Sequence, residues 1–359
     1  MLLDNIVYKK SIYKLLEETD IKWDDFRNKR FLISGATGLI GATLVNTILA
    51  SNHIYNTECK MYLLVRNIDK AEEIFGKSEY INLILCKDIR NISDFNEKVD
   101  FVIHAASKTA SKDFVNFPID TIMTNVLGSK NMLDIAKCVN AKKFIYLSTM
   151  EVYGVHNEDK KIKETEEINC RTDIVRNSYP LSKMLAENLC ASYSAECGIE
   201  TCILRLTQTF GPGVKYNDER VFAEFARCAV EGRDIILKTK GETKRSYLYT
   251  TDAVSAILQV LNIKSNYCEV YNVANEDSYC SIYDMACMIA ELYKDKNICV
   301  KIEEQDINKL GYAPVLKINM DTRKLRSTGW KPKYTLPDAF INLIDWMKSE
   351  HNDIYKSKE

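Results

Sequence analysis

Short apolar runs alternate with longer stretches of helical periodicity through the first half of the chain. The runs are RFLIS (30–34), MYLLVR (61–66), INLILC (81–86), DFVIHA (100–105) and KFIYLS (143–148). Their length and their content of β-branched and aromatic residues predict strands. The unbroken apolar character of LLV and FVI indicates strands that are covered on both faces. The alternation therefore predicts an α/β fold with a doubly wound parallel sheet between two layers of helices.

Three regions follow from the same pattern. Residues 1–28 precede the first strand and carry Ile, Tyr, Leu and Trp at roughly helical spacing, which predicts an N-terminal helical extension. Residues 29–205 hold the regular alternation and form the sheet domain. After residue 205 the pattern weakens, and the Gly-Pro-Gly at 211–213 opens an irregular region. We expect residues 206–359 to form a smaller C-terminal substrate-binding lobe, with some elements returning to the sheet.

Composition narrows the class of protein. The 359 residues are 46% apolar, which is enough for a substantial core, and 49 Lys and Arg against 50 Asp and Glu give a net charge of -1. Without a positive field, a nucleic-acid partner is not expected. No apolar run approaches the roughly 18 residues that span a bilayer, and no signal peptide is visible, so we expect a cytoplasmic protein without a membrane partner.

Cysteine and histidine give no sign of a metal site. The 12 cysteines are scattered without a CxxC pair, and the four histidines are dispersed. We expect reduced, mostly buried thiols and no metal.

The first chemical motif is GATGLIG at residues 35–41, between the first predicted strand and a helical pattern. Gly35 permits the tight turn, Gly38 lets a pyrophosphate approach the backbone, and Gly41 allows the helix to pack closely on the strand. A helix that begins near Leu39 would offer unpaired N–H groups to that phosphate. The motif predicts a dinucleotide site and hence a Rossmann-type sheet.

Two residues bear on which dinucleotide binds. Arg66 follows the second strand, where a guanidinium suits a 2′-phosphate, so the sequence leans towards NADP(H) over NAD(H). Stacking of Arg66 on adenine, or a place in solvent, is the alternative. Asp88 follows the third strand and is either an adenine contact or a turn former.

A second motif carries acid–base chemistry. Tyr179 and Lys183 lie four residues apart in NSYPLSKMLAEN, which puts them on one helix face. An ammonium beside the phenol would lower its pKa, and a phenolate can take the proton of a sugar hydroxyl as hydride leaves its carbon. Thr149 can hydrogen-bond the oxygen being oxidised. Glu151 can act as acid or base at the neighbouring carbon, or has a structural role.

With these motifs in this order, the chain resembles the extended short-chain dehydrogenase/reductase family, specifically its nucleotide-sugar epimerases, dehydratases and decarboxylases. The likeness covers about residues 30–348. Its motifs are GATGLIG, HAAS (104–107), TNVLGSKNML (124–133), STMEVYG (148–154), YPLSK (179–183), RLTQTFGPG (205–213), RVFAEF (220–225), TKRSYLYTTDAVSAI (243–257), YNVAN (271–275) and GWKPKYTL (329–336).

The resemblance implies a reaction and a partner. Hydride passes from a sugar carbon, usually C4, to NAD(P)+, chemistry follows on the ketone, and the hydride usually returns. The implied substrate is a nucleotide-diphosphate sugar, as used in polysaccharide biosynthesis. The family likeness also implies a homodimer through the helices that contain residues 125–136 and 179–189.

The resemblance also carries site residues onto this sequence. Thr149, Tyr179 and Lys183 match the oxidation machinery, with Glu151 as a further candidate catalytic residue. The implied cofactor contacts are Gly35, Thr37, Gly38, Leu39, Ile40, Gly41, Arg66, Asp88, Ile89, His104, Ala105, Ala106, Ser107, Asn125, Tyr179 and Lys183. The implied substrate contacts are Lys108, Phe114, Met150, Gln208, Val221, Phe222 and Arg245. Arg245 matches the arginine that clamps the diphosphate, while Val221 and Phe222 either shelter the nucleotide base or belong to the core.

Departures from the family pattern bear on the reaction. Met150 stands where 4,6-dehydratases have a proton-donating aspartate. The sequence is most similar to those of UDP-glucuronate decarboxylases, which have serine at this position and a tyrosine near Phe114. Gln208 replaces the asparagine that is typical of the family. Epimerisation, decarboxylation and elimination all stay open after oxidation. A net NADP-dependent oxidoreductase acting on a nucleotide-linked sugar and a non-catalytic dinucleotide sensor are the alternatives.

Overall fold

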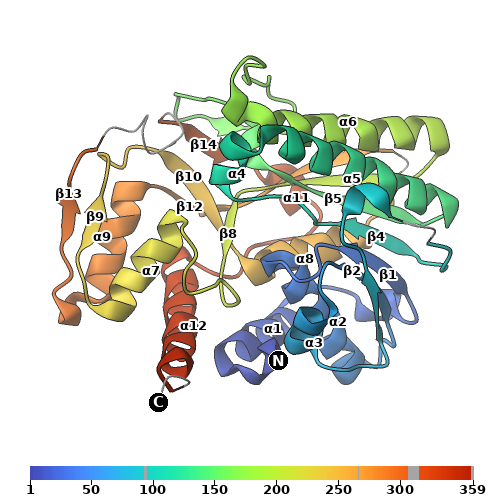
Figure 1. Ribbon diagram of the computed structural model, residues 1–359, viewed down its shortest axis with the longest axis horizontal. Coiled ribbons are helices and arrows are strands. Elements are labelled where there is room, and N and C mark those ends of the chain that lie inside the picture. The colour runs from blue at the N-terminus through green and yellow to red at the C-terminus, as the bar shows by residue number, and fades with distance from the viewer. Residues whose placement is uncertain (93–94, 266, 306–314, 357–359) are drawn as a thin grey trace.

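A parallel seven-stranded sheet forms the centre of the protein (Figure 1). The computed structural model describes residues 1–92, 95–265, 267–305 and 315–356, with side chains to residue 351. The strand order is β11-β7-β5-β4-β1-β2-β3. The strands are β1 (Arg30–Ser34), β2 (Lys60–Val65), β3 (Ile81–Leu85), β4 (Phe101–His104), β5 (Lys143–Thr149), β7 (Thr201–Leu206) and β11 (Glu269–Val273). The predicted doubly wound sheet is confirmed, and the order reverses between β1 and β4, where open α/β sheets bind ligands.

Helices cover both faces of this sheet, as the predicted burial of the strands requires. The helices on one face are α2 (Leu39–Tyr55), α3 (Ile68–Phe75) and α8 (Thr250–Leu261), and those on the other are α5 (Pro118–Cys138) and α6 (Ser178–Cys197). Side chains of β1 alternate between two apolar clusters: Phe31 and Ile33 join the cluster of α2 and α8, while Leu32 joins that of α5 and α6. This period of two is the reason that the strand is apolar throughout.

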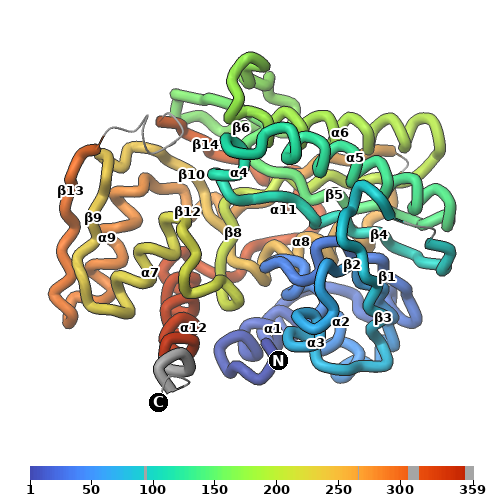
Figure 2. Tube along the Cα trace, in the orientation of Figure 1, coloured from blue at the N-terminus to red at the C-terminus, as the bar shows by residue number. Residues whose placement is uncertain are grey.

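Strands mostly from the second half of the chain, with β6 from the first half, build a smaller sheet beside the first (Figure 2). Its strands are β6 (Lys161–Ile162), β8 (Gln208–Phe210), β10 (Lys244–Tyr249), β12 (Asn275–Ser281) and β14 (Lys317–Met320). A separate pair joins β9 (Ile235–Leu237) to β13 (Val300–Ile302). Strand β10 runs directly into α8, and β11 extends the central sheet at β7, so the two sheets share continuous elements.

The remaining helices are short or lie around this second sheet. They are α4 (Ser111–Asn116), α7 (Val221–Glu231), α9 (Ile282–Leu292), α11 (Arg323–Arg326) and α12 (Leu336–Lys356). Single 3-10 turns are η1 (Leu2–Asp4), η2 (Trp23–Phe26), η3 (Ile89–Asn91), η4 (Met150–Tyr153), η5 (Val175–Asn177) and η6 (Lys294–Lys296).

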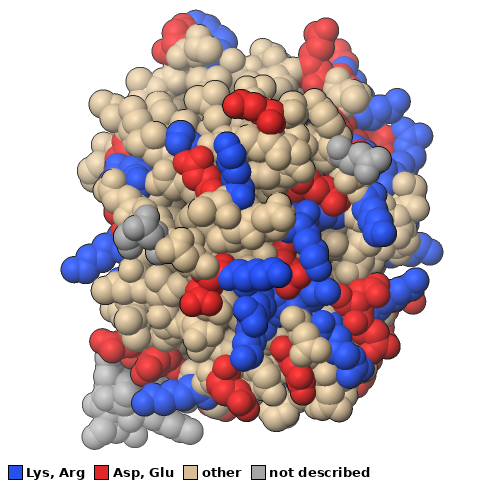
Figure 3. Space-filling model, turned by 90° about the vertical axis from the view of Figure 1, so that its right-hand side faces the viewer, with Lys and Arg blue, Asp and Glu red and all other residues tan. Residues whose placement is uncertain are grey.

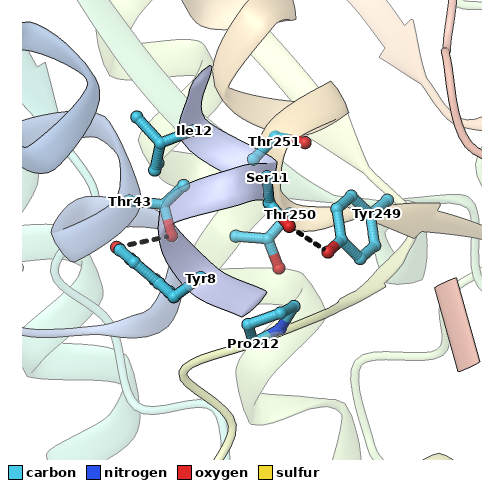
Figure 4. Close-up of a pocket in the computed structure, with 8 residues that line it drawn as sticks. All are labelled: Tyr8, Ser11, Ile12, Thr43, Pro212, Tyr249, Thr250 and Thr251. Atoms are coloured by element: carbon cyan, nitrogen blue, oxygen red, sulfur yellow. Dashed lines mark hydrogen bonds between the residues drawn. The ribbon is translucent and has the colours of Figure 1, made fainter. Parts of the chain in front are cut away.

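The N-terminal helix α1 (Ile6–Glu18) fastens several distant parts of the chain together (Figure 4). Its buried Tyr8 donates a hydrogen bond to Thr43 Oγ1 of α2 at 3.4 Å. Ser11 Oγ and Tyr249 OH, at the end of β10, lie 2.7 Å apart. Asn5, which caps α1, donates to Ser349 Oγ of α12 at 2.8 Å. The helix therefore joins the first βα unit to the C-terminal elements.

The surface mixes both signs of charge. On the face that lies on the right in Figure 1, Lys and Arg side chains are interspersed with Asp and Glu (Figure 3). Within the described ranges, no helix is both long and apolar enough to cross a membrane, and no group of three or more His, Cys, Asp or Glu is placed to hold a metal ion. All 12 cysteines are free thiols; four are buried, six are half-buried and two are exposed, so fewer are buried than predicted.

The packing of α1 gives a prediction about stability. Ile12 is fully buried in α1 beside α2 and α8. We expect Ile12→Ala to lower the free energy of unfolding by about 2–5 kcal/mol, because it leaves a cavity in this contact. Lys10→Ala on the exposed side of the same helix should change it by less than about 0.5 kcal/mol. Denaturant unfolding measures both, and equal stabilities of Ile12→Ala and wild type would show that α1 adds nothing to the fold.

Candidate active site

The glycine-rich turn joins β1 to α2 and leaves no room for side chains. Gly35 has a φ of +70°, and a Cβ there would lie 2.6 Å from the Ala105 carbonyl carbon and the Ala106 nitrogen. A Cβ on Gly41 would lie 2.2 Å from the Gly35 oxygen. The two glycines therefore allow the close approach of the turn, the loop after β4 and the first turn of the helix.

The start of α2 presents free backbone donors at this turn. The first helical hydrogen bond runs from Ala42 N to Gly38 O at 2.8 Å. The N–H groups of Leu39, Ile40 and Gly41 therefore have no intrahelical acceptor, and no side chain caps the helix. Open donors at the positive end of the helix dipole, beside a cradle that excludes side chains, fit the pyrophosphate of a dinucleotide.

The loop after β4 is tied to the helices on the other face of the sheet. Ser107 Oγ donates to Asn125 Oδ1 of α5 at 2.9 Å, and Asn125 Nδ2 donates to Ser182 Oγ of α6 at 2.9 Å. His104 Nδ1 lies 2.7 Å from Ser34 Oγ at the end of β1. Burial, with the nearby charge of Lys183, lowers the pKa of His104 to about 3, so this imidazole is neutral at physiological pH. These contacts fix the strand ends at the switch point.

The two candidate adenosine contacts, Arg66 and Asp88, differ in whether their charged groups are already paired within the protein. Arg66 is exposed at the end of β2, with no ion pair to any described residue. Asp88 caps η3 and accepts hydrogen bonds from the Arg90 backbone and guanidinium, which lowers the pKa of its carboxyl. Asp88 therefore serves the turn, one of its two predicted roles. Ile89 packs against Gly128 of α5, where a Cβ would lie 2.8 Å from its Cγ2.

The catalytic candidates meet where β5 ends and α6 begins. Thr149 is the last residue of β5 and caps η4, where its Oγ1 accepts from Glu151 N at 3.3 Å. Tyr179 and Lys183 lie in the first turns of α6 and are both buried. The Thr149 and Ser107 hydroxyls lie close enough to the Tyr179 phenol to lower its pKa. The two hydroxyls that the sequence analysis paired thus converge at the carboxyl edge of the sheet.

Charges around the phenol differ from the predicted arrangement. Burial raises the pKa of Tyr179, and the Glu151 carboxylate raises it further, while the Thr149 hydroxyl, the Arg176 charge and the Ser107 hydroxyl oppose the shift. The net change is upward, against our prediction of a lowered pKa. Lys183 Nζ donates to the Leu147 carbonyl at 2.8 Å and lies 5.9 Å from the centre of the Tyr179 ring.

Lys183 itself is strongly affected by its surroundings. Burial lowers the pKa of this ammonium to about 7, and the charge of Glu187 partly restores it. Lys183 also lies over the Tyr146 ring, with 4.7 Å between Nζ and the ring centre. Its charge is therefore poised to change near neutral pH.

Two neighbours of Tyr179 were missed by sequence reasoning or given another role. The rings of Phe114 and Tyr179 stack with 4.2 Å between centres and 4° between planes. Arg176 Nη1 pairs with Glu151 Oε2 at 2.5 Å, and its guanidinium lies 5.6 Å from the centre of the Phe114 ring. The signal for Arg176 was its position three residues before Tyr179, which places it at the entrance to the catalytic helix.

A buried polar network lies behind the catalytic residues and was also missed. Glu187, one turn after Lys183, accepts from Ser148 Oγ at 2.5 Å and pairs with Arg205 Nη2 at 2.7 Å. Arg205 Nη1 donates to Tyr153 OH at 3.0 Å. The network connects β5, α6, β7 and η4, and so sets the distance between Thr149 and the catalytic helix.

Two of the predicted substrate residues lie in packed interiors. Met150 is buried in a small apolar cluster, and its sulfur accepts from Thr207 Oγ1 at 3.3 Å. Phe222 is fully buried and stacks on Phe210 with 4.8 Å between ring centres, so it belongs to the core, the alternative left open for it.

The other predicted substrate residues keep part of their surface accessible. Gln208, Val221 and Arg245 are half-buried. The Nε of Arg245 is shielded from solvent and has no partner among the described residues. Lys108 pairs with Asp120, which also pairs with Arg90. Arg245 therefore stands out, because a shielded guanidinium nitrogen without an acceptor favours an anionic ligand.

The parts together define an α/β enzyme that binds a dinucleotide and carries a tyrosine and a lysine on one helix. Residues 31–274 match the NAD dependent epimerase/dehydratase family, and the chain belongs to this family.

Curated relatives and solved structures agree with this assignment. The chain is 28% identical to UDP-glucuronic acid decarboxylase 1 of Xenopus tropicalis, over 94% of this chain and 75% of the relative. It is 27% identical to UDP-N-acetyl-alpha-D-glucosaminuronate decarboxylase of Bacillus cytotoxicus, over 90% and 99%. UDP-N-acetylglucosamine 4-epimerase of Methanobrevibacter ruminantium has a similar fold, with a TM-score of 0.76 at 21% identity over 90% of this chain and 99% of that one.

Buried His104 gives a prediction about pH. Its pKa falls from 6.5 to about 3 on folding, so on acidification the unfolded state takes up a proton that the folded state does not. Stability is full above pH 6.5 and is lost as the pH falls towards 3. Between pH 8 and pH 5 we expect protonation of this imidazole in the unfolded state to lower the free energy of unfolding by about 2 kcal/mol. The free energy of unfolding of His104→Asn should therefore fall by about 2 kcal/mol less than that of wild type between these two pH values. Denaturant unfolding at both pH values measures the difference.

Exposed His53 supplies the control for this experiment. His53→Asn should lose as much stability as wild type between the two pH values. An equal loss in His104→Asn would contradict the prediction, whatever the absolute stability of that variant.

Proposed function

We propose that this enzyme oxidises the C4 hydroxyl of a nucleoside-diphosphate sugar to a ketone, through Tyr179, Lys183 and Thr149. The carrying observation is that Thr149, at the end of β5, and the buried Tyr179 and Lys183 of α6 lie at the strand edge that also holds the glycine-rich turn, with Lys183 Nζ bonded to the Leu147 carbonyl of the same strand. A nicotinamide dinucleotide held at the glycine-rich turn would supply the hydride acceptor. Tyr179 takes the proton of the alcohol, Thr149 hydrogen-bonds its oxygen, and Lys183 orients the site.

We further propose that the ketone serves decarboxylation of a uronic acid. A ketone at C4 lies β to the C6 carboxylate. The C5–C6 bond breaks, its electron pair passes to the C4 oxygen as an enolate, CO2 leaves, and C5 takes up a proton from solvent. Return of the hydride to C4, and of a proton to its oxygen, then restores the alcohol. The names of the decarboxylases reported above support this choice. Elimination has less support, because the buried Met150 cannot supply a proton to a leaving hydroxyl.

The preference for NADP(H) rests on Arg66. Its exposed guanidinium at the end of β2 is available to a 2′-phosphate. Mass spectrometry of the dinucleotide released from purified protein tests this proposal. A cytoplasmic location is also part of the proposal, since all 12 cysteines are free.

A homodimer through α5 and α6 completes the proposal. Large apolar side chains are exposed along these two helices: Ile119, Met123 and Leu127 on α5, and Leu185 on α6. The three on α5 are spaced by four residues and share one face. Apolar exposure of this kind fits a self-complementary interface.

Tyr179→Phe tests the oxidation step. We expect the rate of cofactor reduction by UDP-glucuronate to fall about 100- to 10,000-fold, because the phenol no longer takes the proton. Single-turnover absorbance at the nicotinamide band measures this rate, and dinucleotide affinity should stay within about twofold. Tyr193→Phe, later on α6 and bonded to Asp134, should leave the rate unchanged. Full activity of Tyr179→Phe would remove the basis of the proposal.

Product analysis separates the reactions and the alternatives. NMR and mass spectrometry of products from UDP-glucuronate should show loss of CO2. An unchanged mass would point to epimerisation, and loss of water to elimination. A steady absorbance change during turnover would indicate a net oxidoreductase, and failure to transform any nucleotide sugar would indicate a sensor.

Leu127→Asp tests the dimer. A charge buried without a partner in a two-fold interface is costly, so we expect the dimer to dissociate at least about tenfold more readily. Sedimentation velocity at several concentrations gives the dissociation constant. Ile341→Asp on α12, where Ile341 is also exposed, is the control and should leave it unchanged. A monomeric wild type, or an unaffected Leu127→Asp dimer, would exclude this interface.

A further inference from the structure

Arg176 has unused hydrogen-bonding capacity beside the catalytic tyrosine. It lies in η5, directly before α6, and its charge lowers the pKa of the Tyr179 phenol. Among the described residues its one hydrogen-bond partner is Glu151, through Nη1. Its Nε is shielded from solvent and has no partner. A guanidinium has five N–H donors, and the bond to Glu151 uses one of them.

The surroundings of Arg176 favour an acceptor with a carboxylate's geometry. The guanidinium lies against the Phe114 ring, which in turn stacks on Tyr179. An aromatic surface holds the planar group in place without using its donors. A shielded donor without an acceptor costs free energy that a ligand oxygen recovers. The edge formed by Nε and Nη2 presents two parallel donors, which match the two oxygens of a carboxylate.

We propose that Arg176 binds the carboxylate of the substrate's sugar and so selects uronic acids; this assignment rests on the proposed function. Phe114 has no hydroxyl with which to hold that carboxylate, and it supports Arg176 instead. Glu151 stays on Nη1, so the Arg176–Glu151 pair as a unit is neutral. Recognition of the substrate therefore depends on directed hydrogen bonds from Nε and Nη2 more than on net charge.

Arg245 is the competing cation, and it has a different place. It lies on β10 in the second sheet, opposite Cys280 of β12, and also has a shielded Nε without a described partner. A residue that holds the diphosphate contacts every nucleotide sugar alike. A residue that holds the sugar carboxylate discriminates UDP-glucuronate from UDP-glucose, which have the same nucleotide. The two roles therefore separate in a binding experiment.

The test measures dissociation constants of UDP-glucuronate and UDP-glucose by calorimetry, in a Tyr179→Phe background so that neither sugar reacts. Arg176→Met should weaken UDP-glucuronate about 10- to 100-fold and UDP-glucose less than about twofold. Arg176→Lys keeps the charge without the planar fork and should lose an intermediate part of the selectivity. Arg245→Met should weaken both sugars alike. Arg171→Met, in the same loop with its exposed partner Asp173, should change neither.

The ratio of the two constants within each variant decides the outcome. An equal loss for both sugars in Arg176→Met, or no loss for either, overturns the assignment. If Arg176→Met does not fold, as judged by thermal unfolding, unchanged selectivity in Arg176→Lys overturns it equally. Failure of the proposed function is recognised separately, because the parent protein would then show no cofactor reduction with any nucleotide sugar.

Discussion

One buried carboxylate, that of Glu187, fixes the place where β5, which carries Thr149, meets α6, which carries Tyr179. It accepts from Ser148, the neighbour of Thr149 on β5, and pairs with Arg205 of β7. Since Glu187 follows Lys183 by one helical turn, a shift of this carboxylate moves the base of α6 relative to the strand end. Loss of one partner would leave a buried charge uncompensated, at about 3–5 kcal/mol. The meeting of Tyr179 with Thr149 depends on this constraint.

Much of the fold and part of the site could be predicted from the sequence. Strand positions and the glycine-rich turn are local properties. Hydrophobic periodicity indicates the strands, and glycine marks the turn positions where the backbone leaves no room for a side chain. The network around Glu187 could not be predicted, because its members lie far apart in the chain. The roles of apolar residues such as Met150 and Phe222 could not be decided from the sequence, because the same spacing of apolar residues occurs in a hydrophobic core and in the lining of a binding site. The direction of the Tyr179 pKa shift depends on burial, which local sequence does not reveal.

Two charges near the phenol act on its pKa in opposite directions. Glu151 raises the pKa of Tyr179 and Arg176 lowers it, and the two are paired. Because burial adds to the effect of Glu151, the chain's own groups keep the phenol protonated at neutral pH. The free protein therefore holds Tyr179 as a neutral phenol.

The direct passage of β10 into α8, together with the return of β11 to the central sheet, affects how this enzyme can be altered. The elements around the second sheet do not form a separate unit that could be exchanged by itself. A chimera that takes these elements from a relative, to change the sugar preference, would also have to replace helix α8 and the edge strand β11 of the central sheet. Exchange of single side chains is therefore the more economical route to altered specificity in this scaffold.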